Sequence, residues 1–76
     1  MLDVVVDSRQ IQSVPGLVPR HVELAGLSPR EVRAIHDAHH ADALYARLDR
    51  PDGDEVEVKR IWQDPHDPGR ITLYLE

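Results

Sequence analysis

The chain has 76 residues, of which 41% are hydrophobic and 30% are charged, and it contains no cysteine. This length allows one small globular domain, and this balance argues against intrinsic disorder. Lysine and arginine total 9 against 14 aspartates and glutamates, so the net charge is -5. Because nucleic-acid binding depends on cationic side chains that neutralise phosphates, we expect no nucleic-acid partner.

No apolar run approaches the roughly 18 residues of a membrane-spanning helix, and the first residues lack the apolar stretch of a secretory signal. The absence of cysteine excludes disulfides and thiolate metal sites. We therefore expect a cytoplasmic protein without a membrane partner. Residues 1–76 are expected to form a single small α+β domain.

The first predicted element is a strand over residues 2–7, LDVVVD, because its β-branched run suits a buried strand. Residues 8–20 carry turn formers without sustained periodicity, which predicts a loop. Residues 21–24 alternate polar and apolar side chains, which indicates a short half-buried strand.

The strongest local signal is the sequence LSPRE at residues 27–31. Ser28 is suited to the helix N-cap, Pro29 tolerates the first helical position, and Glu31 can complete a capping box. No glycine or proline follows until Pro51, so the sequence predicts one long helix over residues 29–49.

Two apolar rows run along different sides of this predicted helix. One row is Ala34, Ala38, Ala41, Tyr45 and Leu48, and the other is Val32, Ile35, His39, Ala43 and Ala46. A helix that packs on a sheet needs only one such row, so we expect either a kink near His39 and His40 or a second cover. The loop over residues 8–20 or another chain would supply that cover, which makes Val32, Ile35 and His39 candidate partner-binding residues.

Residues 55–62 and 70–76 both alternate at period two and are predicted to pair as a hairpin. The alternation places two apolar sets each on one face of its strand: Val56, Val58 and Trp62 on the first strand, and Ile71, Leu73 and Leu75 on the second. Tyr74 is expected on the outer face. Together these elements predict an α+β fold: a small antiparallel or mixed β-sheet, built from the C-terminal hairpin and the N-terminal strand, with one long helix packed on a face.

Acidic residues concentrate toward the end of the chain. Residues 51–76 hold seven acidic against three basic residues, a charge of -4, whereas residues 28–50 hold four of each. One interpretation is a solvated turn and edge strand, where charge deters aggregation. The other is an acidic surface that docks on a basic partner protein. Its candidate partner-binding residues are Asp52, Asp54, Glu55, Glu57 and the aromatic Tyr74.

His36 and His40 lie four residues apart on the predicted helix, the spacing at which two imidazoles can share one metal ion such as zinc. A zinc site usually needs three or four protein ligands, and no third ligand can be assigned from the sequence. We therefore expect solvated or partly packed histidines, and keep a zinc site at His36 and His40 as an alternative.

No sequence pattern predicts catalysis. The serines lie in no nucleophile elbow, and the four glycines are isolated and form no phosphate-binding loop. We expect a small acidic, non-enzymatic protein-binding module without a required cofactor: an inhibitor, an antitoxin, a phage-type modulator or an accessory subunit. Its partner would be another protein or a second copy in a homodimer. The alternatives are a metal-binding or metal-sensing domain that uses the helix histidines, and a homodimeric structural domain.

Overall fold

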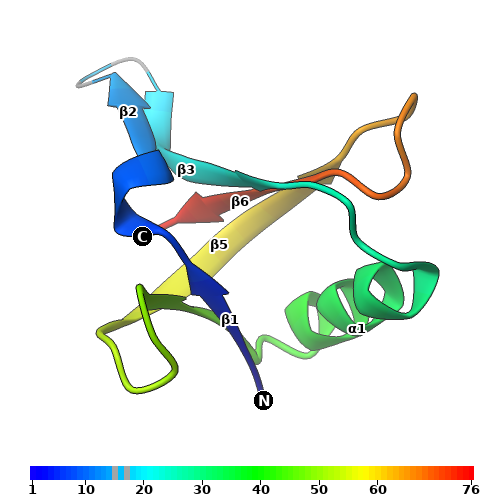
Figure 1. Ribbon diagram of the computed structural model, residues 1–76, viewed down its shortest axis with the longest axis horizontal. Coiled ribbons are helices and arrows are strands. Elements are labelled where there is room, and N and C mark those ends of the chain that lie inside the picture. The colour runs from blue at the N-terminus through cyan, green and yellow to red at the C-terminus, as the bar shows by residue number, and fades with distance from the viewer. Residues whose placement is uncertain (15, 17) are drawn as a thin grey trace.

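The computed structural model describes residues 1–14, 16 and 18–76 (Figure 1). Its elements are β1 (Leu2–Val6), the short 3-10 helix η1 (Ser8–Gln10), β2 (Gln12–Val14), β3 (Val18–Leu24), α1 (Pro29–His40), β4 (Leu44–Leu48), β5 (Glu55–Gln63) and β6 (Ile71–Leu75). The strands form one six-stranded mixed sheet on which α1 packs, so the predicted α+β class is confirmed. Within the described residues, no helix has the length and apolar character needed to cross a membrane.

The strand order of the sheet is β1-β4-β5-β6-β3-β2. β1 and β4 run parallel, and the other neighbouring strands run antiparallel. β5 joins two halves of the sheet, because its residues 55–57 pair with β4 and its residues from Val58 onward pair with β6. The two edge strands, β1 and β2, are consecutive in the chain and are connected by η1. The sheet therefore curves so that this short connection can link its two edges (Figure 1).

The inner face of the sheet carries the hydrophobic core. Its buried side chains come from both halves of the sheet, and the helix supplies one of them. They are Val6, Val22, Ile35, Leu44, Ala46, Val58, Ile71, Leu73 and Leu75. Because β1, β3, β4, β5 and β6 all contribute, burial of this one cluster holds the two halves together.

The predicted start of the helix is confirmed. The Glu31 amide donates to Ser28 Oγ at 3.1 Å, and the Ser28 amide donates to Glu31 Oε1 at 3.0 Å, which completes the predicted capping box. The hydrogen bond from the Ser28 amide stabilises the ionised carboxylate and, with the Ser28 side chain, lowers the pKa of Glu31.

The predicted length of the helix is wrong, because α1 has 12 residues and ends at His40. Asp42 has a φ of 55°, in the left-handed region that aspartate tolerates. The Asp42 amide donates to the His39 carbonyl at 3.1 Å, and the Ala43 amide donates to the Ala38 carbonyl at 2.8 Å. This Schellman arrangement ends the helix without glycine. The absence of glycine and proline before Pro51 therefore did not mean that the helix continued to that point.

Residues 44–48, predicted as helix, form strand β4. Leu44 and Ala46 are 2% and 0% exposed, while Tyr45 and Arg47 are half-buried on the outer face. The sequence LYARL alternates at period two, but the same residues also fit a helical row. Only pairing with β1 and β5 decides between the two.

Of the two alternatives expected for the helix, the break near His39 and His40 is close to what is observed, since α1 ends at His40, and within the single chain only one side of the helix is covered. Ile35 is buried, Val32, Ala38 and His39 are half-buried, and Ala34 is exposed. One side of α1 therefore packs on the sheet, and the opposite side is solvated.

The predicted C-terminal hairpin is confirmed, since β5 and β6 pair antiparallel and the three apolar residues of β6 are buried. The prediction that Trp62 shares a face with Val56 and Val58 is wrong, because both valines pack in or against the core and Trp62 is 50% exposed. A register shift between Val58 and Arg60 marks a bulge at Lys59. The bulge moves the alternation by one residue, so Ile61 packs against the core and Trp62 turns outward.

The remaining predictions concern the first 24 residues. The predicted N-terminal strand is confirmed as β1, and the predicted strand over residues 21–24 is the second half of β3. The predicted loop over residues 8–20 is wrong in part, because η1, β2 and the start of β3 lie there. Pro15 and Leu17 of this segment are outside the described residues. β2 has only three residues, too few for periodicity to identify.

Candidate functional site

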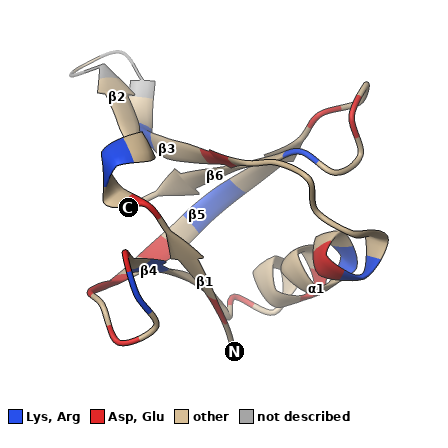
Figure 2. Cartoon of the chain, in the orientation of Figure 1, with Lys and Arg blue, Asp and Glu red and all other residues tan. Residues whose placement is uncertain are grey.

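The acidic residues predicted to bind a partner lie on β5 and in the turn that precedes it (Figure 2). Asp52 and Asp54 are exposed in this turn, and Glu55 and Glu57 are exposed on β5. The structure therefore gathers these four residues at one end of the sheet. Arg47, on the neighbouring strand β4, lies directly opposite Glu55 and forms an ion pair with it.

Arg47 neutralises part of this acidic end. Its Nη2 lies 2.5 Å from Glu55 Oε2, and its Nη1 donates to the Gly53 carbonyl at 3.2 Å. Its Nε lies 3.5 Å from Asp3 Oδ2 on β1, within ion-pair distance but without the geometry of a hydrogen bond. Arg47 thus connects β1, β4, β5 and the turn, which reduces the charge that a basic partner would meet.

Tyr74 lies on β6, the strand next to β5, where it is opposite Arg60 and beyond the part of β5 that carries Glu55 and Glu57. The Arg60 guanidinium lies 4.8 Å from the centroid of its ring, and the His21 ring centroid lies 5.7 Å from that centroid. Both are cross-strand neighbours, and they leave Tyr74 half-buried. The ring of Tyr74 therefore packs with a cation and an imidazole and not with the four acidic side chains, and Trp62 is the exposed aromatic residue of this half.

The helix residues predicted to bind a partner face the sheet instead. Ile35 belongs to the core and Val32 packs against it, so Ile35 is not available to a partner. His39 Nε2 lies 3.4 Å from the Lys59 carbonyl oxygen. Because a carbonyl only accepts, this ring nitrogen donates the hydrogen bond, and His39 ties α1 to β5.

His36 and His40 are both exposed on α1. His36 Nε2 lies 2.8 Å from Gln63 Oε1, and Gln63 Nε2 donates to the Pro68 carbonyl at 3.0 Å. Since the Pro68 carbonyl only accepts, Gln63 turns its oxygen toward His36, and His36 Nε2 is the donor. Among the described residues, no three His, Cys, Asp or Glu side chains gather in a way that could hold a metal ion. The zinc hypothesis therefore rests on the spacing of the two histidines alone.

One edge of the sheet, formed by β1, was not identified as a site from the sequence. In the described part of the chain β1 pairs with β4 and with no other strand. The Leu2 amide donates to the Ala43 carbonyl at 2.8 Å, and the Asp49 amide donates to the Val6 carbonyl at 2.7 Å. Backbone groups alternate in direction along a strand, so the even-numbered residues of β1 face β4.

Asp3 and Val5 consequently turn their backbone N–H and C=O groups toward the open side of β1. The Val5 side chain is 46% exposed. The strand carries none of the lysine, proline or bulge with which proteins usually protect an edge, and its one charge, Asp3, is paired with Arg47. An edge of this kind is a template for another strand.

A groove of about 340 Å³ lies beside this edge and reaches from β1 to α1. Apolar side chains from β1, the end of β3, the connection that follows it and α1 line it, among them Val4, Leu27 and Ala34. Asp3 and Glu31 add carboxylates to the lining. A strand laid along β1 would cover these apolar groups while its backbone meets the free edge.

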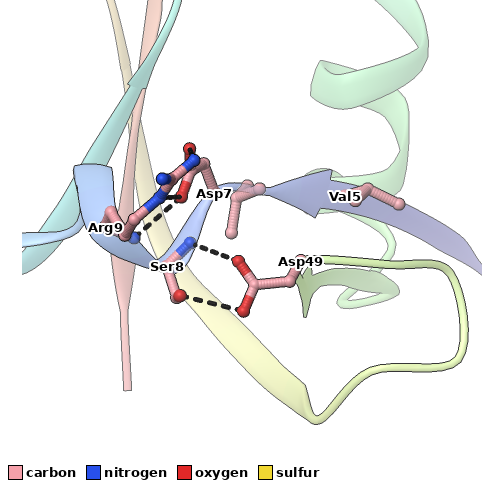
Figure 3. A pocket seen from close by; sticks show the side chains of 6 residues that line it. Val5, Asp7, Ser8, Arg9 and Asp49 are labelled. Atoms are coloured by element: carbon pink, nitrogen blue, oxygen red, sulfur yellow. Dashed lines mark hydrogen bonds and ion pairs between the residues drawn. The ribbon is translucent and has the colours of Figure 1, made fainter.

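A hydrogen-bonded clamp holds the end of β1 (Figure 3). Asp49, with a φ of 69°, accepts at 2.9 Å from the Ser8 amide through one carboxylate oxygen and at 2.9 Å from the Ser8 hydroxyl through the other. The Arg9 side chain donates to Asp7 at 3.1 Å, and this hydrogen bonding lowers the pKa of Asp7. A hollow of about 540 Å³ lies at the clamp. Because one carboxylate holds both groups of Ser8, the arrangement fixes the chain where β1 ends.

Comparison of the chain with protein-family models, with curated proteins and with solved structures finds no significant match. The functional conclusion therefore depends on the geometry of the sheet edge and its groove.

Proposed function

We propose that the chain is a non-enzymatic protein-binding module that takes up an extended polypeptide segment as an added strand along β1. The observation that carries this proposal is the outward-facing backbone of Asp3 and Val5 on an apolar, unprotected edge strand. In this mode of recognition, backbone hydrogen bonds supply affinity and alternate side chains supply specificity.

The groove beside β1 favours a particular kind of segment. Alternate side chains of an added strand point to the same face, and those on the inner face would lie against Val4 and the apolar wall formed with α1. We therefore propose that the segment carries apolar, β-branched residues at alternate positions. Asp3 and Glu31 already have partners in Arg47 and Ser28, so charge contributes less to affinity than apolar burial does.

The acidic end of the sheet affects the rate of encounter with a partner and not the contact along β1. Glu55 and Glu57 lie on β5, two strands away from the open edge, with Arg47 on the strand between. A net charge of -5 accelerates encounter with a basic partner, slows encounter with an acidic one and changes affinity less in either case. We accordingly place the acidic residues around the site and not in it.

Selection from a library of random short peptides tests the proposal, with wild-type protein and Val5→Pro screened in parallel. Proline at this position removes an outward-facing donor and leaves the ladder with β4 intact. We expect selected peptides to bind Val5→Pro about tenfold more weakly, the effect of losing about 1.4 kcal/mol of hydrogen bonding. Val5→Thr, which keeps both the β-branch and the donor, should bind them as wild type does.

Amide hydrogen exchange locates the bound peptide. The amides of Asp3 and Val5 should exchange quickly in the free monomer and become protected in the complex. Peptides that bind Val5→Pro as tightly as wild type, protection confined to other strands, or a screen that yields no ligand would each contradict the proposal.

A further inference from the structure

We propose that the segment that pairs with β1 is β1 of a second copy of the chain, aligned antiparallel about a two-fold axis at Val4. This inference rests on the proposed function and names its partner. The resulting dimer would carry one continuous sheet through both copies, with the two open edges paired with each other.

The direction of the backbone groups limits how two β1 strands can pair. In an antiparallel ladder, residues that face the partner must lie opposite residues that also face the partner. Asp3 and Val5 are the outward-facing residues within the strand. A two-fold axis that satisfies this condition within the strand passes through Asp3, Val4 or Val5.

The charges of the strand select one of these three registers. An axis at Asp3 places this carboxylate opposite its own copy, and an axis at Val5 places Asp3 opposite Asp7 of the second copy. Like charges directly opposite each other destabilise a strand pair. An axis at Val4 instead places Asp3 opposite Val5 of the second copy, so that no carboxylate lies opposite another.

The same register also gives the longest overlap. With the axis at Val4, Leu2 lies opposite Val6 of the second copy, and every residue of the strand Leu2–Val6 has a partner. The outward-facing groups of Asp3 and Val5 then form about four backbone hydrogen bonds between the copies. Charge pattern and strand length therefore select one register independently of each other.

The groove beside β1 fits this arrangement. The axis places the even-numbered residues of both strands on the inner face, where Leu2 and Val4 are half-buried and Val6 is buried. The wall of the groove on α1 includes the small side chain of Ala34, which is exposed in the single chain. A second β1 would cover this apolar surface, and the two helices would lie on the same face of the joined sheet.

Salt distinguishes a second copy from a basic peptide as the occupant. Each copy has a net charge of -5, so two copies repel at long range, and screening by salt should strengthen the dimer. A basic partner would instead be released by salt. Sedimentation equilibrium at low and high salt, from micromolar to millimolar protein, should show a dimer that dissociates less at high salt.

Single cysteines placed in this cysteine-free chain test the register. Residues on the axis of a non-hydrogen-bonded pair have Cα atoms about 4.5 Å apart, a separation that a disulfide can bridge. With oxidised glutathione as the oxidant, Val4→Cys should form a covalent dimer. Val5→Cys on β1 and Ser13→Cys on β2 should form covalent dimers at least about tenfold more slowly than Val4→Cys. In this register the two sulfurs of either variant cannot approach each other.

A monomeric mass at millimolar protein, or faster linking of Val5→Cys than of Val4→Cys, would overturn the inference. A different result would contradict the proposed function, namely that selected peptides bind Val5→Pro and wild type equally. A monomer that still binds peptides through Asp3 and Val5 would keep the proposed function and remove self-pairing. Circular dichroism of each variant establishes that the sheet is retained.

Discussion

The two edges of the sheet differ in length, chemistry and regularity. β1 offers five residues, LDVVV, in unbroken register with β4, whereas β2 offers three, QSV, with a register irregularity against β3. Gln12 and Ser13 of β2 are exposed and polar, while Val5 of β1 is exposed and apolar. Short length, polar side chains and irregular pairing are the usual protections of a sheet edge, and β2 combines them.

The contrast indicates that one edge is closed to further pairing and the other is open. An unprotected apolar edge invites aggregation unless a regular occupant covers it. This is the physical reason to place the binding site at β1.

The largest expected effect comes from removing the core beneath β1. Leu44 lies opposite Leu2 and is 2% exposed, so Leu44→Ala should lower the free energy of unfolding by about 3 kcal/mol through the cavity it leaves. Leu24→Ala, at a half-buried position of β3, should cost less. Urea unfolding measures the free energy of unfolding of both variants. Equal losses in the two variants would contradict the central place of Leu44 in the core.

Two proline substitutions compare the inner and outer sides of the same strand. Val4 turns its amide toward β4, so Val4→Pro should cost about 2 kcal/mol by leaving a ladder acceptor without its donor. Val5→Pro removes an outward-facing amide and should cost well under half as much when the protein is dilute. Urea unfolding at low protein concentration checks this difference, and a greater loss for Val5→Pro would contradict the assigned direction of the backbone.

Charge at Val5 should act on self-association with little effect on the fold. In the proposed register Val5 lies opposite Asp3 of the second copy, so Val5→Glu should weaken the dimer about tenfold, corresponding to about 1.4 kcal/mol. Val5→Arg should weaken it less, because its opposite neighbour is a carboxylate. Ser13→Glu on β2 is the matched control and should leave the sedimentation mass unchanged. A dimer that tolerates Val5→Glu better than Val5→Arg would point to a different register.

The smallest expected effect is on the pH dependence of stability. The pKa values of Glu31 and Asp7 are lowered in the folded chain by hydrogen bonds with Ser28 and Arg9. A lowered folded pKa stabilises the fold above the unfolded pKa, and this stabilisation is lost as the pH falls through the folded pKa. Urea unfolding as a function of pH should show a shallower acid loss for Glu31→Gln and Asp7→Asn, and Ser28→Ala should resemble Glu31→Gln.

Local signals predicted the parts of the fold that short stretches of chain can decide. The capping box at Ser28 and Glu31 depends on neighbours three residues apart, and the hairpin of β5 and β6 depends on alternation and an intervening turn. The end of the helix depends on the left-handed conformation of Asp42. Aspartate adopts this conformation only at some positions, so the residue type alone does not predict it. The inward or outward direction of Trp62 depends on a bulge that has no sequence signature of its own.

The candidate site was less predictable than the fold. The sequence drew attention to acidic residues and to apolar helix positions, but Ile35 lies in the core and Glu55 is paired with Arg47. The valines of β1 were recognised as a strand, and their pattern equally fits a central strand or an edge. The sequence LDVVV does not indicate whether the strand pairs with one neighbouring strand or with two.

The sequence by itself determined an acidic, cysteine-free α+β chain, the start of its helix and four of its strands, because these follow from composition and from contacts between near neighbours. Only the tertiary structure decided that residues 44–48 are a strand, that Trp62 turns outward and that, in the part of the chain that the structure describes, β1 pairs with one strand. Those outcomes depend on pairing between segments far apart in the chain, where the energy of burial and of ladder hydrogen bonds outweighs local preference.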